Sequence, residues 1–226
     1  MVAQPVAADT LPGVLDLVVY GASGFGQQVM FWVEDSTAAG ERWNPLGFVD
    51  DDEAAHGDER TGHAVLGGRD WVLERAASGP LAVVLGIAVP EIKQRIVAGL
   101  EQSETVEFPS VVHPSAVLSK HCAVERGSVV GPQNVLSVNV AAGPFATVNT
   151  ACTLGHDARV GEFATLLPGC NVSGHVRIER GASMGTNSAV SQHVVVGEGA
   201  VVGAGATVVD DLPAGCTAVG TPARPI

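Results

Sequence analysis

Residues 146–166 read ATVNTACTLGHDARVGEFATL, and an apolar residue returns in this stretch at every sixth position. The same count continues in both directions and selects seventeen consecutive apolar residues. They are Val112, Leu118, Val124, Val130, Leu136, Ala142, Val148, Leu154, Val160, Leu166, Val172, Ile178, Met184, Val190, Val196, Val202 and Val208. A helix repeats its apolar face about every 3.6 residues and an ordinary strand about every second residue, so this period indicates another geometry.

The position two residues earlier in each repeat is mostly small, as at Ala116, Cys122, Cys152 and Ala158. Short strands joined by tight turns and wound into a triangular solenoid explain both positions. The large side chains fill the prism, and the small ones lie at its corners. We therefore predict a parallel β-helix of hexapeptide repeats, with residues 109–226 as the C-terminal domain.

The first half of the chain has the pattern of a small α/β domain. Apolar runs at 15–21, 46–50 and 81–87 predict buried strands, and helices are expected at 27–35, 69–77 and 90–100. Because strand and helix alternate, the sheet should be parallel and Rossmann-like. We assign residues 1–14 to an N-terminal tail and residues 15–108 to this domain.

The formal charge of −12 belongs to the first half, because residues 1–108 hold 17 acidic and 6 basic side chains, against 7 and 6 in residues 109–226. Without a cluster of Lys or Arg to displace counterions from phosphates, nucleic acid is not an expected partner. No run approaches the roughly 18 apolar residues of a membrane span, and the first residues lack the pattern of a signal peptide. We expect a cytoplasmic protein that does not bind membranes.

The sequence GASGFG connects the first strand to the first helix. Glycines let the backbone approach a ligand, and a helix N-terminus offers free N–H groups to phosphate, although any strand-to-helix turn can need glycine. The spacing GxxGxG differs from the dinucleotide pattern GxGxxG, so a nucleotide fits but NAD is not indicated. The candidate substrate-binding residues are Gly21, Ser23, Gly24, Phe25 and Gly26, together with Asp50 and Asp51, which end the second strand where a ribose hydroxyl can be bound.

His156 occupies a repeat position that does not point into the prism. One coil of about 18 residues further on, Gly174 should stack beside it, followed by His175. An imidazole beside an exposed backbone N–H is the pair that acyl transfer needs, a base for the attacking group and a donor for the oxyanion. A histidine on the edge of a solenoid with no such role is the alternative.

Four stretches together resemble the family of sialic acid O-acetyltransferases and UDP-4-amino-sugar N-acetyltransferases. These are the GASGFG turn, LGFVDD at 46–51, the stretch 149–163 with its His156-Asp157 pair, and GTPAR at 220–224. The resemblance covers residues 15–224. It implies a left-handed β-helix, an N-terminal domain that binds a sugar nucleotide, acetyl-CoA bound along the solenoid between the subunits of a homotrimer, and no metal ion.

Carried over residue by residue, the resemblance implies that His156 is the base and Asp157 its acidic neighbour. Asn149 matches an asparagine close to the base, and Gly174 the glycine whose N–H meets the thioester carbonyl. The implied CoA-binding residues are Gly174, Gly185, Thr186, Ala204 and Arg224.

This chain departs from the family at positions that handle substrate. The family often has histidine where this sequence has Phe25 and Thr165. Many members also place a basic residue where this chain has Gln27 or Asp52, so the chain lacks a basic residue for a UDP diphosphate at either position.

We expect a CoA-dependent N-acetyltransferase that acts by direct transfer on a nucleotide-linked amino sugar. O-acetylation of a sialic acid or another small hydroxylated metabolite needs the same base and stays open. Two further alternatives are a non-catalytic trimer that binds a nucleotide sugar and a γ-type carbonic anhydrase. The latter uses three zinc-binding histidines, whose paired spacing this sequence lacks.

Overall fold

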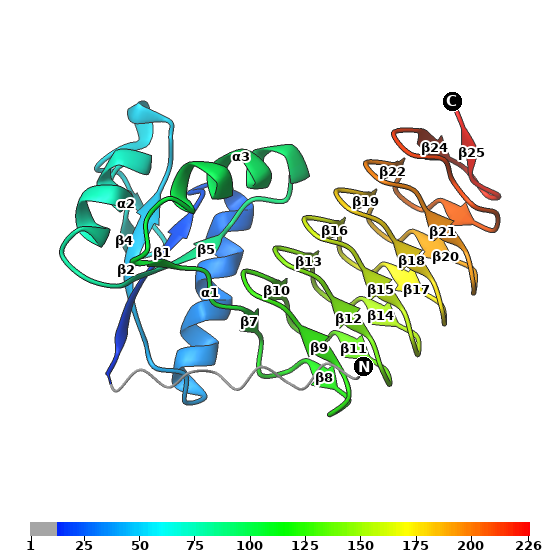
Figure 1. The fold of residues 1–226 in the computed structure, drawn as a ribbon, viewed down its shortest axis with the longest axis horizontal. Coiled ribbons are helices and arrows are strands. Elements are labelled where there is room, and N and C mark those ends of the chain that lie inside the picture. Colours follow the sequence, from blue (N-terminus) through cyan, green and yellow to red (C-terminus); the bar gives the residue numbers. More distant parts are fainter. Residues whose placement is uncertain (1–12) are drawn as a thin grey trace.

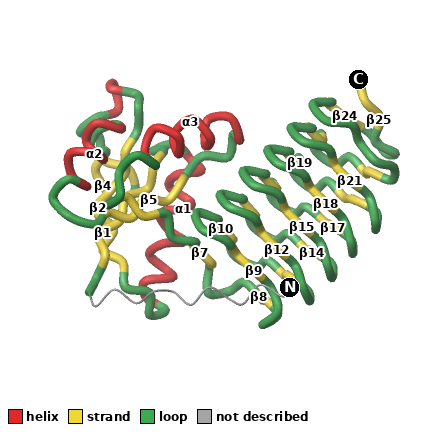
Figure 2. Tube along the Cα trace, in the orientation of Figure 1, coloured by secondary structure: helices red, strands yellow, loops and turns green. Residues whose placement is uncertain are grey.

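The computed structural model describes residues 13–226, and a small α/β domain lies beside a long solenoid (Figure 1). The expected N-terminal tail, residues 1–14, lies outside the described residues except for Gly13 and Val14. All helices of the described chain belong to the first half, and the second half consists of very short strands joined by turns (Figure 2). No helix in residues 13–226 is long and apolar enough to span a membrane.

The α/β domain contains a parallel four-stranded sheet in the order β2-β1-β5-β6. Its strands are β1 (Leu15–Tyr20), β2 (Trp43–Val49), β5 (Leu81–Leu85) and β6 (Val106–Glu107). Helix α1 (Gly24–Ala38) covers one face, while α2 (Arg69–Ala76) and α3 (Pro90–Leu100) cover the other. A 3-10 turn η1 (Glu53–Ala55) and a hairpin of β3 (Glu59–Arg60) and β4 (His63–Ala64) follow β2. The predicted alternation is confirmed, and β6 is an additional strand.

The second half is a left-handed β-helix with three parallel sheets, which we call face 1, face 2 and face 3. Face 1 holds β7 (Val111–Val112), β10 (Val129–Val130), β13 (Thr147–Val148), β16 (Thr165–Leu166), β19 (Ser183–Met184), β22 (Val201–Val202) and β24 (Thr217–Val219), with the antiparallel β25 (Arg224–Pro225) at its end. Face 2 holds β8 (Val117–Leu118), β11 (Val135–Leu136), β14 (Thr153–Leu154), β17 (Asn171–Val172), β20 (Ala189–Val190) and β23 (Thr207–Val208). Face 3 holds β9 (Ala123–Val124), β12 (Ala141–Ala142), β15 (Arg159–Val160), β18 (Arg177–Ile178) and β21 (Val195–Val196).

The register of the solenoid follows the repeat read from the sequence. Paired residues are 18 apart, as in Thr153 opposite Asn171, so equivalent positions of successive coils stack directly. The sixth-position residues fill the prism, where Val148 and Leu166 are fully buried. Cys152 and Cys170 are also fully buried, which agrees with their interpretation as small hydrophobes.

Each coil turns at three corners, and non-glycine residues at these turns adopt positive φ. Phe145 and Phe163 do so at the corner between faces 3 and 1, and Asp157 and His175 at the corner between faces 2 and 3. We refer to these as the 3-1 corner and the 2-3 corner, and to the third as the 1-2 corner.

The α/β domain packs on face 1 and the 3-1 corner. Trp32 of α1 lies so close to Gly131 that a Cβ atom there would be 2.7 Å from the indole ring. Phe145 and Phe163 stack at 5.0 Å between ring centroids and join the core cluster that contains α2 and α3. Tight packing at this joint gives the domain a fixed position on the prism.

Lys93 of α3 is 1% exposed and connects the two halves of the molecule. Its Nζ donates to the Phe145 carbonyl at 2.9 Å, to Thr165 Oγ1 at 3.0 Å and to Thr147 Oγ1 at 3.1 Å. These partners are all neutral, and burial lowers the pKa of Lys93 to about 7. Thr165, which stands where the family often has histidine, is therefore a buried partner of Lys93.

Candidate active site

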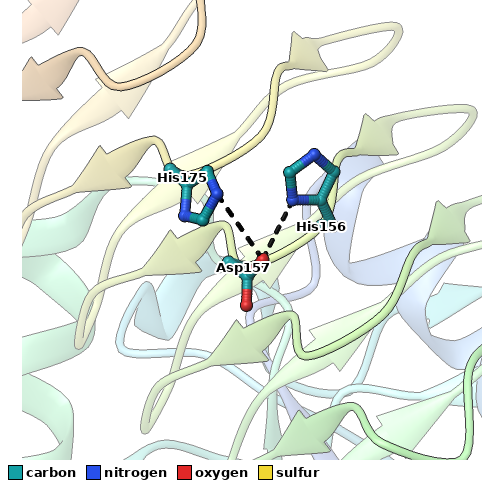
Figure 3. A group of neighbouring side chains, drawn as sticks. All are labelled: His156, Asp157 and His175. Atoms are coloured by element: carbon teal, nitrogen blue, oxygen red, sulfur yellow. Dashed lines mark hydrogen bonds and ion pairs between the residues drawn. The ribbon is translucent and has the colours of Figure 1, made fainter.

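His156 lies at the 2-3 corner, in the turn between β14 and β15, and its side chain is 59% exposed. Its Nδ1 is 2.9 Å from Oδ2 of Asp157 (Figure 3). A carboxylate accepts hydrogen bonds only, so the shared proton is on Nδ1 and Nε2 is left with a free lone pair. This is the tautomer that a general base requires.

Asp157 is held from several sides. It has a φ of +60° at the corner, and Asn139 Nδ2 donates to its Oδ1 at 3.1 Å. His175 Nε2 lies 3.7 Å from Oδ2. The hydrogen bond to His156, followed by that from Asn139, lowers the pKa of Asp157, so the carboxylate stays ionised at neutral pH.

Gly174 stacks against His156 as the 18-residue count predicts. A Cβ atom at position 174 would lie 2.7 Å from Nε2 of His156, so the imidazole occupies the space above this glycine. Within residues 13–226 the Gly174 N–H donates to no acceptor. A base and a free backbone donor therefore lie side by side, which supplies both groups that acyl transfer needs.

Residues of the 2-3 corner stack into a column along the solenoid. Asn139, Asp157, His175 and His193 all have positive φ and follow one another at intervals of one coil. The rings of His175 and His193 stack at 4.8 Å, and those of His156 and His175 meet edge to face at 4.9 Å. Asn139 is missing from the sequence-based site, although counting one coil back from Asp157 identifies it.

The structure does not bring the other predicted residues to this corner. Asn149 is 4% exposed, lies at the 1-2 corner, and accepts from the Thr150 N–H at 2.7 Å. Gly185, Thr186 and Ala204 form a group at the same corner, where a Cβ atom on Gly185 would be 2.5 Å from the Ala204 nitrogen. Face 2 separates them from His156 by roughly 15–20 Å.

Arg224 lies in β25 at the far end of the solenoid. Its Nη1 is 3.1 Å from Oδ2 of Asp210 and 3.0 Å from the Ala223 carbonyl oxygen. The guanidinium is therefore already engaged within the chain, and it is exposed to solvent.

A cavity of about 440 Å³ lies at the carboxyl end of the α/β sheet. Of the predicted substrate-binding residues, it is lined by Gly21, Ser23, Phe25, Asp50 and Asp51. It meets the general rule that ligands of open parallel sheets bind at the carboxyl ends of the strands. Five of the seven predicted residues thus line one cavity, and substrate binding there stays a prediction.

Gly24 and Gly26 do not line the cavity. Gly26 is required by packing, because a Cβ atom there would be 1.8 Å from the Gly21 carbonyl oxygen. Gly24 has open space around it at the start of α1. The glycine turn therefore combines residues that face the cavity with a glycine required by packing, and the sequence alone does not separate the two.

The two aspartates shape the cavity by hydrogen bonds. Asp50 Oδ2 accepts from the Ala22 N–H at 2.8 Å and fixes the glycine turn. Asp51 Oδ1 accepts from the Tyr20 hydroxyl at 2.5 Å, and burial together with this carboxylate raises the pKa of Tyr20. The opposite wall comes from the segment after β5 and from α3, and the sequence-based site lacks it. It consists of Gly86, Ile87, Ala88, Val89, Ile92, Arg95 and Ile96.

The cavity and His156 lie on different sides of the prism in one chain. Helix α3, which forms one wall of the cavity, packs on the 3-1 corner, where Gln94 contacts Arg180. His156 is at the 2-3 corner, so the whole of face 3 lies between them. The cavity and the imidazole of the same chain are therefore separated by the width of face 3.

Known proteins match this chain in two ways, by a family model over the α/β domain and by solved structures over nearly the full chain. The family model of the PglD N-terminal domain matches residues 16–100. A comparison with curated protein sequences gave no significant match.

Several solved structures match nearly the full chain. WeeI from Acinetobacter baumannii AYE is 30% identical with a TM-score of 0.83, over 94% of this chain and 100% of that one. The acetyltransferase domain of PglB from Neisseria gonorrhoeae FA1090, in complex with acetyl coenzyme A, is 28% identical with a TM-score of 0.82, over 95% and 100%. A mutant of perosamine N-acetyltransferase from Caulobacter crescentus, in complex with CoA and GDP-perosamine, is 25% identical with a TM-score of 0.85, over 95% and 98%. The chain thus belongs to the hexapeptide-repeat, acetyl-CoA-dependent acetyltransferases that carry a PglD N-terminal domain.

Proposed function

We propose that this protein transfers the acetyl group of acetyl-CoA to the amine of a nucleotide-linked amino sugar, with His156 as the general base. The observation that carries the proposal is the position of His156, with Nδ1 on Asp157 and Nε2 against Gly174. The similar structures with CoA and GDP-perosamine, or with acetyl coenzyme A, support this class of donor and acceptor.

The reaction follows from this arrangement. As the acceptor nitrogen attacks the thioester carbon, His156 Nε2 takes the amine proton and Asp157 stabilises the imidazolium. The Gly174 N–H donates to the carbonyl oxygen as it becomes negative. When the carbon–sulfur bond breaks, the CoA thiolate takes the proton from His156. CoA then leaves as the thiol, the amide is complete, and His156 is neutral again.

The acceptor would be held in the cavity of the α/β domain, with its hydroxyl groups on the acidic wall. Carboxylate oxygens accept hydrogen bonds from hydroxyls, as Asp50 and Asp51 are placed to do. A cavity of about 440 Å³ is in the range of small-molecule sites.

A homotrimer completes the site in this proposal. The cavity of one subunit would face the 2-3 corner of the next, and CoA would lie between the 2-3 corner of one subunit and the 1-2 corner of another. The exposed valines of face 2, Val117 and Val135, together with Val138, agree with a contact surface on this side of the prism.

The test is the rate of acetyl transfer by His156→Ala. We expect the rate to fall by about 10²–10⁴-fold if the imidazole acts as a general base. His121→Ala is the matched control, because that histidine is exposed on an earlier coil and its ring has no partner in the described chain. Near-normal turnover of His156→Ala with acetyl-CoA bound would refute the role of the base.

The same assay with a set of acceptors separates the remaining possibilities. Amino-sugar nucleotides, sialic acids and other hydroxylated compounds distinguish N- from O-acetylation, and a protein that only senses nucleotide sugars yields no product. Metal analysis without stoichiometric zinc would exclude a γ-type carbonic anhydrase.

A further inference from the structure

Arg95 is the one basic residue among the residues that line the cavity of the α/β domain. It projects from α3, it is exposed, and it forms no ion pair or hydrogen bond with any residue in the range 13–226. Most other arginines of this domain have acidic partners, as Arg75 has Asp16 and Arg60 has Asp58. Arg95 is therefore a free cation at the mouth of a binding site.

Two other basic residues lie near the cavity, and both have partners: Arg69 Nε is 4.0 Å from Asp70 Oδ1, and Lys93 binds the solenoid. Lys93, two residues earlier on α3, is buried against the solenoid. Gln27 donates from Nε2 to the Ala22 carbonyl, and Asp52 accepts from the Ala54 N–H, so both are used locally. Positions 27 and 52, which are basic in many family members, therefore supply no positive charge in this chain.

The wall of the cavity opposite Arg95 is acidic. Asp50 and Asp51 bring two carboxylates to the cavity, and a diphosphate placed near them would be repelled. A phosphate group is therefore favoured beside Arg95, on the wall opposite the two aspartates.

We propose that Arg95 binds the diphosphate of a nucleotide-linked sugar and so replaces, from α3, the basic residue absent after the glycine turn. This inference rests on the proposed acceptor class. An arginine suits this role, because its planar guanidinium can donate a pair of hydrogen bonds to two phosphate oxygens. Arg95 would then set the preference for nucleoside-diphosphate sugars over sugars without phosphate.

The test is calorimetric binding of GDP, UDP and dTDP to the full-length protein and to Arg95→Gln. Loss of a hydrogen bond to a charged group weakens binding by about ten- to a hundredfold, and we expect this change for the diphosphate that binds the wild type. The KM for the nucleotide-linked acceptor should rise similarly, while the KM for acetyl-CoA stays unchanged. Arg95→Lys should recover part of the affinity.

Arg42→Gln is the matched control, because Arg42 is an exposed arginine just before β2, at the amino end of the strands, whereas the cavity lies at their carboxyl end. We expect it to bind diphosphates as the wild type does. Equal affinity of Arg95→Gln and wild type would overturn the role of Arg95 and leave the proposed function standing. If the wild type binds none of the three nucleotides, both the role of Arg95 and the proposed acceptor class are wrong, whereas acetyl transfer by His156 is tested separately.

Discussion

A methyl group at position 174 would occupy the space that the His156 ring now fills. The clash is with an exposed side chain that can rotate, so Gly174→Ala should displace the imidazole and leave the backbone in place. We expect kcat to fall by about 10²-fold, the scale at which a misplaced catalytic group costs rate. Steady-state kinetics and thermal melts on the same preparation measure activity and stability together.

Gly155→Ala gives the contrasting result. A Cβ atom at position 155 would be 2.6 Å from the backbone nitrogen of Gly174, which cannot rotate away. Overpacking of this kind costs about 1–3 kcal/mol, so this variant should melt at a lower temperature. If Gly174→Ala lost as much stability as Gly155→Ala, the glycine at 174 would be required by the fold and not by the imidazole.

Asp157→Asn preserves the shape of the side chain and removes its charge. Asparagine can donate to Nδ1 of His156, which favours the wrong tautomer, and it no longer stabilises an imidazolium. We expect kcat to fall by about 10–10⁴-fold with little change in the KM for acetyl-CoA. A variant with unchanged kcat would show that Asp157 only packs against the histidine column.

Lys93 holds α3 on the solenoid by hydrogen bonds, and burial lowers its pKa in the folded protein to about 7. Between this value and the ordinary value of 10.5, the unfolded chain binds more protons than the folded chain, so stability rises with pH across that window. We expect Lys93→Met to remove this contribution, whose slope is at most about 1.4 kcal/mol per pH unit. Chemical denaturation of both proteins from pH 6 to 10 measures it.

Lys120→Met is the control for this experiment, because Lys120 is exposed on the solenoid. Its pH dependence of unfolding should match that of the wild type. An identical slope for Lys93→Met and wild type would mean that Lys93 is charged in the folded protein throughout this range.

Lys93 also shows where prediction from sequence stops. The bounds of α3 follow from Pro90 and the apolar spacing, and they are correct. The burial of its lysine depends on Thr147 and Thr165, more than 50 residues away, and on how the domain packs against face 1. Local periodicity carries no information about that packing.

In the solenoid, by contrast, the sequence does predict contacts between distant residues, because they repeat at a fixed interval of 18 residues. Counting by 18 predicts that Gly174 lies beside His156, and it also identifies Asn139 beside Asp157. For the cavity, the glycine turn and the aspartates predict one wall. The other wall, with Arg95, lies on a helix without a motif, so only the topology of the sheet could indicate it.

In the complete protein, the separation of the cavity from His156 predicts complementation between subunits. Neither His156→Ala nor Asp50→Ala should be active alone, the latter because Asp50 fixes the glycine turn of the cavity. Co-expressed at equal levels in a closed ring, the two variants should place an intact cavity beside an intact base in about a quarter of the interfaces.

Recovery of activity in the mixed preparation is measured against each variant purified alone, with the oligomeric state determined by light scattering. Two inactive parents that stay inactive after verified mixing, or a protein that is monomeric and active, would show that one chain completes the site by itself.

The strict repeat of the prism also sets which changes in chain length the enzyme can tolerate. An insertion of six residues between His156 and Gly174 would move every later residue forward by one face. The Gly174 N–H would then no longer lie beside His156, although the apolar interior would stay intact. An added stretch of a full coil beyond His193 keeps the phase and only lengthens the column. Length variation among such enzymes should therefore occur in whole coils toward the C-terminal end, where it does not change the spacing of His156 and Gly174.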